Sequence, residues 1–231
     1  MSGPFVDMPR RRRVRRRWAT PLLALVMIAT YVWIALLPDD AAWREALLRW
    51  GTLSGSVTDW GAALRDERLL TLLSALFIHA DVMHLAGNLL FLLIFGAPAE
   101  RAMGPWRFLA LFLLGGAAAN LAAVLAIGTP DRLIIGASGA VSALIGAYLA
   151  LFPTARLGLV LPLGLFLQFV RMPAAVLIGV WAGLQLVYTF VGPAFGAVAW
   201  SAHLAGFAVG GAFGLVSRAA IHRRMKRVHG F

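Results

Sequence analysis

Six apolar stretches joined by polar connections are the feature that most limits how this chain can fold. Most of them approach the roughly 20 residues that a helix needs to cross the ~30 Å hydrocarbon layer of a bilayer. Lipid offers no partner to backbone polar groups, so such segments cross as helices. The pattern predicts an all-α membrane protein, a six-transmembrane-helix bundle. The stretches are 18–37, 82–97, 106–127, 138–152, 173–191 and 198–217.

The composition agrees with this class. Hydrophobic residues make up 61% of the 231 residues and charged residues only 13%, whereas soluble domains average about 45 to 50% apolar. The length allows one membrane domain, which we expect over 18–217, between basic cytoplasmic tails at 1–17 and 218–231. The chain has no cysteine, which excludes disulfides and thiolate chemistry. The five histidines are spread out without the spacing of metal ligands.

The net charge of +11 is concentrated beside the first and last apolar stretches. This distribution follows the positive-inside rule and favours contact with anionic lipid rather than with nucleic acid. Two basic ends on one side require an even number of crossings, which fits six. We therefore expect a multi-pass protein of the bacterial inner (plasma) membrane with both termini cytoplasmic. The basic residues are those at 10–13 and 15–17, and Arg223, Arg224, Lys226 and Arg227.

Two further segments are not counted as spans. The stretch 157–170 has about 14 residues and contains Pro162 and Gly164, which favours an interfacial or re-entrant segment over a crossing. Residues 38–81 form a long external loop. Aromatic residues favour the headgroup region, so this first external loop is predicted to be membrane-associated. Its tryptophans are Trp43, Trp50 and Trp60.

Four polar residues are predicted to lie at one depth in the membrane. In a six-crossing topology the second, fourth and sixth stretches all run inward from the outer face. At about 1.5 Å per residue, Asn88, Ser138 and His203 each lie roughly 7 to 9 Å below that face. His84 precedes Asn88 by four residues and shares its helix face. Intramembrane polar groups are costly unless they face protein or water, which favours a functional site.

Small residues indicate how Ser138 and His203 approach each other. Gly206, Gly210 and Gly214 follow His203 along one stripe of the sixth stretch. Stripes of this kind also occur in plain helix packing. Here they face a matching surface on the fourth stretch, and close contact would bring the His203 imidazole within hydrogen-bond reach of the Ser138 hydroxyl. The matching residues are Gly139, Ser142, Ala143 and Gly146.

The third member of a Ser-His-Asp triad is not evident. All ten acidic residues fall in tails, loops or span boundaries, and neither Asp81 nor Asp131 is forced toward His203. The sequence therefore predicts a dyad of Ser138 and His203. His84, Asn88 and the backbone N–H of Ser138 are the candidate donors to a developing oxyanion.

These residues resemble the rhomboid intramembrane serine proteases over roughly 60–217. The resemblance implies that Ser138 is the nucleophile, that His203 is the general base and acid, and that His84 and Asn88 bind the oxyanion. It also implies single-pass transmembrane substrates cut near their outer end, and no cofactor. The matching motifs are His79-x4-His84-x3-Asn88, Phe95-Gly96-x3-Glu100-x3-Gly104, Gly136-Ala137-Ser138-Gly139 and Ala202-His203-x2-Gly206-x3-Gly210.

Three further points follow from the resemblance. His79 occupies a position often kept as histidine near the external loop. Glu100 and Arg101 match a structural element at the cytoplasmic end. Ser142 departs from the pattern, because some relatives carry at this position an aromatic residue that stacks on the catalytic imidazole.

We therefore expect a serine endopeptidase that acts through an acyl-enzyme in a cavity open to the outer side. One alternative is a rhomboid-like protein that binds transmembrane helices without cutting them, although Ser138 and His203 are both present. A second is a small-solute transporter, which is disfavoured because no carboxylate inside a span is evident to couple ions.

Overall fold

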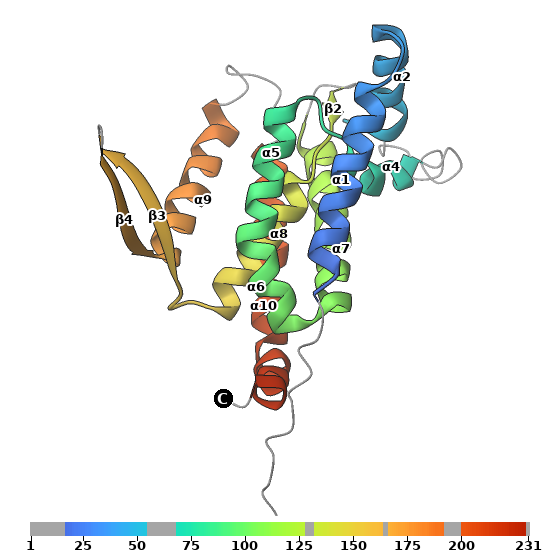
Figure 1. Ribbon diagram of the computed structural model, residues 1–231. Helices are drawn as coiled ribbons and strands as arrows, with labels where there is room; N and C mark the ends of the chain where they lie inside the picture. The colour runs from blue at the N-terminus through green and yellow to red at the C-terminus, as the bar shows by residue number, and fades with distance from the viewer. Residues whose placement is uncertain (1–16, 55–67, 128–131, 164–165, 192–199, 230–231) are drawn as a thin grey trace, which may run out of the picture.

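The computed structural model describes residues 17–54, 68–127, 132–163, 166–191 and 200–229. Over these residues the chain is a bundle of helices with two small antiparallel strand pairs (Figure 1). The helices are α1 (Ala19–Ala35), α2 (Asp40–Trp50), α4 (Arg68–Ser74), η1 (Ala75–Phe77), α5 (Val82–Phe91), η2 (Leu92–Gly96), α6 (Ala97–Met103), α7 (Pro105–Ala126), α8 (Ser138–Leu151), α9 (Ala174–Val191) and α10 (Trp200–His229).

The observed helices follow the predicted stretches closely. The bounds of α1, α7, α8 and α9 lie within two residues of the prediction. The second stretch continues without a break from α5 through the π-helical turn η2 into α6, and so runs over Val82–Met103. The helix formed by the sixth predicted stretch, α10, does not stop at Ser217 but extends to His229. Arginine and lysine are good helix formers, so the basic segment continues the helix once it has started.

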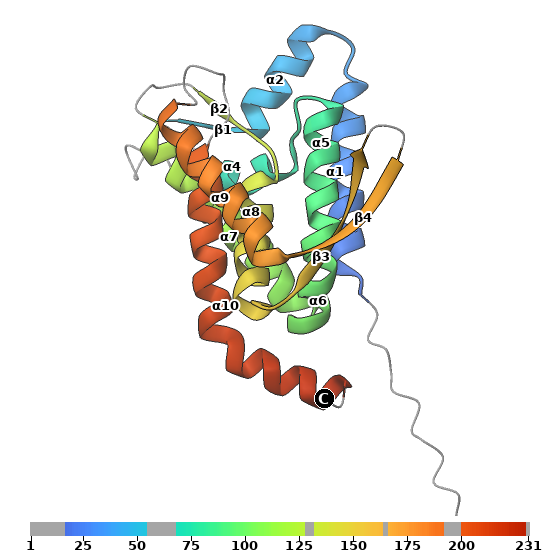
Figure 2. The same cartoon turned by 90° about the vertical axis from the view of Figure 1, so that its left-hand side faces the viewer.

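Four helices in the described part of the chain are long and apolar enough to cross a membrane: Val82–Met103, Pro105–Ala126, Ala174–Val191 and Trp200–Lys226. Two more of the predicted stretches form apolar helices that are shorter, with 17 residues in α1 and 14 in α8. The start of α1 and the end of α10 lie at the same end of the bundle (Figures 1 and 2). This arrangement agrees with an even number of passes.

The stretch 157–170 forms a structure that the sequence analysis did not anticipate. Strands β3 (Arg156–Leu163) and β4 (Phe166–Pro173) pair as an antiparallel hairpin, which projects from the side of the bundle beyond α9 (Figure 1). It is not a helical span, as predicted. The hairpin pairs its own backbone groups, which a re-entrant coil would leave exposed.

The segment that the sequence analysis predicts as the first external loop is described over 38–54 and 68–81, where it forms α2, β1 (Thr52–Leu53), α4 and η1. Strand β1 pairs with β2 (Leu133–Ile134), directly before α8. The Ser54 and Arg132 backbones extend this contact, since the Ser54 amide donates to the Arg132 carbonyl over 2.8 Å. The loop is therefore attached to the segment that leads into α8. Of its tryptophans, Trp60 lies outside the described residues.

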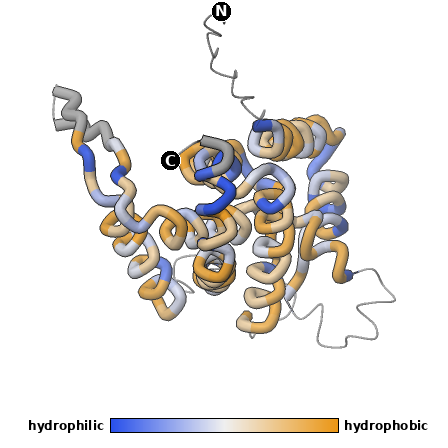
Figure 3. The backbone as a smooth tube through the Cα atoms, turned by 90° about the horizontal axis from the view of Figure 1, so that it is seen from below, coloured by the Kyte–Doolittle hydropathy of each residue, from blue (hydrophilic) through white to orange (hydrophobic). Residues whose placement is uncertain are grey.

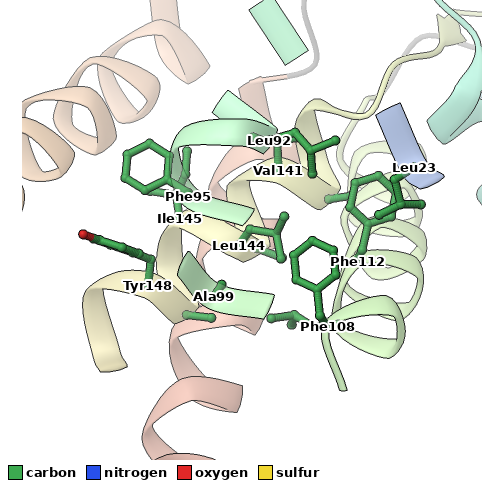
Figure 4. Close-up of a cluster of buried hydrophobic side chains, with 14 of the residues drawn as sticks. Leu23, Leu92, Phe95, Ala99, Phe108, Phe112, Val141, Leu144, Ile145 and Tyr148 are labelled. Carbon is green, nitrogen blue, oxygen red and sulfur yellow. The ribbon is translucent and has the colours of Figure 1, made fainter. Parts of the chain in front are cut away.

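Large apolar side chains fill the centre of the bundle between α5–α6, α7 and α8 (Figure 4). Val141, Leu144 and Ile145 of α8 belong to this cluster, so α8 is packed into a dense core. The most deeply buried side chains of the cluster are Leu92, Phe108, Phe112 and Leu144.

The outer faces of the helices are apolar too. Hydrophobic residues occupy both the inner and the outer sides of the helices when the bundle is viewed along its length (Figure 3). Phe190 and Val216 are 79% and 86% exposed. Helices that are hydrophobic all round belong in lipid rather than in water. The protein is therefore an integral membrane protein built as a multi-helix bundle.

Candidate active site

Ser138 is the first residue of α8, and the segment that leads into it is hydrogen-bonded to η1. Gly136 lies two residues earlier with φ +104°, a conformation that L side chains rarely adopt. The Gly136 amide donates to the Ala75 carbonyl over 2.8 Å. The amide of Ser138 lies at a helix start, where backbone donors have no partner within the helix.

The hydroxyl of Ser138 meets the imidazole of His203. The distance from Ser138 Oγ to His203 Nε2 is 2.8 Å, which is the contact expected of a nucleophile and its base. The predicted approach of α8 and α10 explains it. A Cβ on Gly206 or Gly210 would collide with backbone oxygens of α8, those of Gly139 and Ala143 respectively. The helices touch backbone to backbone because these side chains are missing.

The second ring nitrogen of His203, Nδ1, contacts a residue that the sequence analysis missed. His203 Nδ1 lies 2.6 Å from the side-chain oxygen Oε1 of Gln185, on α9. Gln185 is only 7% exposed. Its signal in the sequence was a single amide inside the apolar run Ala174–Val191, but nothing in the run indicates which helix the amide faces.

Aromatic rings complete the surroundings of His203. Trp200 packs edge-on against the imidazole with 5.8 Å between ring centroids, and Tyr188 stacks on Trp200 at 4.8 Å. Ser142, at the position where some rhomboids carry an aromatic residue, instead donates its hydroxyl to the Ser138 carbonyl over 2.7 Å. Apart from the hydroxyl of Ser138, the side chains that contact the imidazole therefore come from α9 and from the start of α10, and not from position 142 of α8.

His84 and Asn88 lie beside the same segment, as predicted. An ideal Cβ built on Gly136 would overlap the His84 ring and would lie 3.7 Å from Asn88 Nδ2. Asn88 is buried, and its Nδ2 also donates to the His84 carbonyl over 3.0 Å. His84 and Asn88 thus lie against Gly136, two residues before the serine whose hydroxyl contacts His203.

The acidic residues near the outer end do not contact the imidazole in the described part of the chain. Asp81 is the N-cap of α5, where its carboxylate accepts from the His84 amide over 2.8 Å. Asp131 lies outside the described residues. The acceptor on His203 Nδ1 is the neutral amide of Gln185, so the contact is not that of a Ser-His-Asp triad.

His79 lies in the turn before α5, beside His84. Its ring is fully buried and makes an edge contact with the His84 ring at 5.1 Å between centroids. Burial, with a smaller effect of the neighbouring His84, lowers the pKa of His79 from 6.5 to about 4. The ring is therefore neutral at pH 7 and supports His84 by packing.

Glu100 and Arg101 lie far from Ser138 and His203, at the end of the bundle where α1 begins. The Glu100 carboxylate accepts from the backbone amides of Trp18, Ala19 and Thr20 and from the Thr20 hydroxyl, at 2.7 to 3.0 Å. It therefore caps the start of α1. Arg224 of α10 donates to the carbonyls of Arg101 and Ala102 at the end of α6.

Within the described residues, no group of three His, Asp or Glu side chains is arranged to hold a metal ion. The chemistry that the arrangement offers is that of the serine hydroxyl and the imidazole. A hydroxyl hydrogen-bonded to a histidine, with amide and imidazole donors nearby, is suited to nucleophilic attack on a carbonyl.

The fold and the site together define a class of protein: a multi-helix membrane protein in which a partly buried serine–histidine pair lies between two closely packed helices. Comparison with known proteins narrows the class. The family model for the Rhomboid domain matches residues 66–220, so the chain belongs to the rhomboid family.

Curated relatives carry the same family name. The chain is 28% identical over 166 residues to Rhomboid-related protein 2 of Mus musculus. This match covers 62% of this chain and 53% of the mouse protein. It is 40% identical over 77 residues to Rhomboid-related protein 1 of Caenorhabditis elegans, covering 33% and 21%. A protein of Drosophila melanogaster named Inactive rhomboid protein 1 matches at 33% over 85 residues, 37% of this chain and 6% of that protein. The chain thus matches about half of the mouse relative's length.

Proposed function

We propose that this protein is an intramembrane serine endopeptidase that cleaves single-pass transmembrane proteins near the outer face of the membrane. The observation that carries the proposal is the 2.8 Å contact between Ser138 Oγ and His203 Nε2. A protein that only binds transmembrane helices has no need of this contact. Family membership supports proteolysis as the activity, although one matched relative is named inactive.

The reaction proceeds through an acyl-enzyme. His203 Nε2 takes the proton of the Ser138 hydroxyl while Oγ attacks the scissile carbonyl carbon. The carbonyl oxygen becomes an oxyanion, which the Ser138 amide and the side chains of His84 and Asn88 stabilise. His203 then gives its proton to the leaving amine, and the peptide bond breaks. Water attacks the ester in the same way, with His203 again as base and then acid.

The proposed membrane placement has six crossings with both termini in the cytoplasm. The basic residues of α10 and the start of α1 lie at one end of the bundle, and Ser138 lies toward the other, beside the external loop. Positively charged ends favour the cytoplasmic side and anionic lipid. The site then opens to the outer side. The relatives described above come from animals, so placement in a bacterial inner membrane rests on the sequence alone.

The experiment that tests this function combines activity with labelling. The purified protein is incubated in detergent with a panel of labelled single-pass proteins, and separately with a fluorophosphonate. We expect wild type to cleave a substrate and to be labelled, and Ser138→Ala to do neither while staying folded. Ser201→Ala, which removes a hydroxyl two residues before His203, is the matched control and should keep both properties.

Two results would contradict the proposal. Labelling that persists in Ser138→Ala would assign the chemistry to another serine. A folded wild type that neither cleaves any substrate nor reacts with the probe would favour a rhomboid-like protein that binds transmembrane helices without cutting them. A small-solute transporter is disfavoured, because the one buried carboxylate in the described helices, Glu100, is fully used in capping α1.

A further inference from the structure

The second ring nitrogen of His203 has a partner to which the dyad mechanism gives no role. We propose that Gln185 is a positioning residue: its side-chain carbonyl holds His203 in the tautomer and orientation needed to accept the proton of Ser138. The inference rests on the proposed serine protease function. It is carried by the 2.6 Å contact from Gln185 Oε1 to His203 Nδ1, opposite the 2.8 Å contact to Ser138.

The physical basis is the two tautomers of a neutral imidazole. One ring nitrogen carries the proton and the other carries the lone pair. A carbonyl oxygen can only accept, so its contact with Nδ1 places the proton there and leaves the lone pair on Nε2. That lone pair faces the hydroxyl of Ser138. Without the amide oxygen the other tautomer becomes accessible, and in that tautomer Nε2 cannot act as a base.

Three paired contacts set the register that brings Gln185 opposite His203. Trp181, Gln185 and Tyr188 are spaced four and three residues apart, so they lie on one face of α9. They meet, in reverse order along the chain, Phe207, His203 and Trp200 of α10. The centroid distances are 5.9 Å for Trp181 and Phe207, and 4.8 Å for Tyr188 and Trp200.

The aromatic pairs on either side explain how a single amide is held at this place. Each pair lies about one helical turn from the Gln185–His203 contact, so a slip of α9 along α10 by one turn would break all three contacts. The amide is buried, and a buried polar group without a partner is unfavourable because it loses its hydrogen bonds to water. Both effects favour the observed pairing over other positions of α9.

A neutral acceptor also differs from a carboxylate in a predictable way. An amide fixes the tautomer but adds no negative charge beside the imidazolium that forms during reaction. A buried carboxylate would stabilise the imidazolium, but it requires an unfavourable desolvation. Replacement of Gln185 by glutamate therefore keeps the acceptor while it changes the proton affinity of the ring.

The test compares Gln185→Leu, Gln185→Glu and Thr189→Val. Thr189 lies one turn further along α9, where its hydroxyl donates to the Gln185 backbone carbonyl, so its loss controls for polar-group removal from the same helix. For each variant we measure kcat, KM, thermal stability and the pH dependence of the fluorophosphonate labelling rate. Labelling reports activation of Ser138 without any transmembrane substrate.

We expect Gln185→Leu to lower kcat and the labelling rate by roughly 10- to 100-fold with KM changed less than about threefold, as loss of an orienting group predicts. Gln185→Glu should retain more activity than Gln185→Leu. Its added charge favours the protonated ring, so the acidic limb of its pH profile should move upward by about one unit. Thr189→Val should match wild type.

The outcomes separate the two proposals. If wild type is labelled at Ser138 and Gln185→Leu is folded with unchanged kcat, labelling rate and pH profile, the positioning role is wrong while the protease assignment stands. The same holds if Gln185→Glu shows no shift in its pH profile. If Ser138 of wild type is never labelled and no substrate is cut, the protease function fails, and the role of Gln185 fails with it.

Discussion

At the scale of single residues, Gly136 is the point around which the candidate site is arranged. Its positive φ turns the chain into α8, and its missing Cβ leaves the space that the His84 ring occupies. Any side chain here would displace His84 and strain the turn. Glycine at this position thus allows both the positive φ of the turn and the close approach of the His84 ring to the backbone.

The oxyanion role assigned to His84 and Asn88 can be tested by truncating each to alanine. The lost donor matters mainly in the transition state, so we expect kcat to fall by roughly 10- to 1,000-fold with little change in KM. Steady-state kinetics in detergent, with thermal unfolding measured in parallel, checks this. Asp81→Asn is the control, since asparagine also caps a helix start and should leave activity nearly unchanged.

A different result would reassign Asn88. Its Nδ2 already donates to the His84 carbonyl within α5. If Asn88→Ala lowered the melting temperature and left the turnover of the folded fraction unaltered, Asn88 would be a residue of helix packing.

Residues differ in how far the sequence alone could place them. Ser138, His203, His84 and Asn88 follow from motif spacing and common depth, because each lies in the first part of its helix, α5–α6, α8 or α10. Gln185 could not be placed in this way. Its partner depends on the rotation and register of α9, which tertiary packing with α10 decides and which no pattern within one apolar run records.

At the scale of elements, the contact between α8 and α10 brings the dyad together. Gly210 faces the backbone of Ala143, whereas a Cβ on the adjacent Gly211 would meet nothing within 4 Å. One helix thus offers two neighbouring glycines in opposite environments.

This pair gives a controlled prediction. Gly210→Ala inserts a methyl group between two backbones that cannot yield, so the helices must separate. We expect a stability loss of roughly 1 to 3 kcal/mol and a matching loss of activity, since the Ser138–His203 distance increases. Gly211→Ala should be neutral or slightly stabilising, because alanine favours helix over glycine. Thermal unfolding and cleavage rates of the two variants check the difference. Equal effects of both would contradict the close contact.

The elements that the sequence predicted less well differ from the prediction for two reasons. The ends of α6 and α10 extend beyond the apolar stretches, because helix formation does not stop where hydrophobicity stops. The β3–β4 hairpin arises in a run too short to span and interrupted by Pro162 and Gly164. Length argued correctly against a crossing, but periodicity does not distinguish a short apolar strand from a short apolar helix.

At the scale of the whole molecule, Glu100 connects the first helix to the rest of the bundle. Its carboxylate, 1% exposed, accepts four hydrogen bonds from the start of α1. An acceptor at a helix N-terminus also interacts favourably with the helix dipole. The family pattern marked this position in the sequence, whereas the partner on α1, some 80 residues away, is evident only in the structure.

Replacement of Glu100 by glutamine should therefore loosen α1. The amide has one acceptor oxygen, and its NH2 group faces backbone donors, so we expect a destabilisation of about 1 to 3 kcal/mol or more. Arg101→Gln, which changes the charge of the exposed neighbouring side chain, should have little effect. Thermal unfolding of the two variants in the same detergent checks this, and equal melting temperatures for Glu100→Gln and wild type would contradict the capping role.

The position of α10 has a consequence for biosynthesis. The chain is made from its N-terminus, so Ser138 and the two donor side chains of α5 exist well before His203, which is 65 residues further along than the serine. The residue that orients the imidazole also precedes it. If the proposed function holds, a growing chain carries an unactivated hydroxyl until its last described helix packs against α8, and the serine–histidine contact forms only as the bundle is completed.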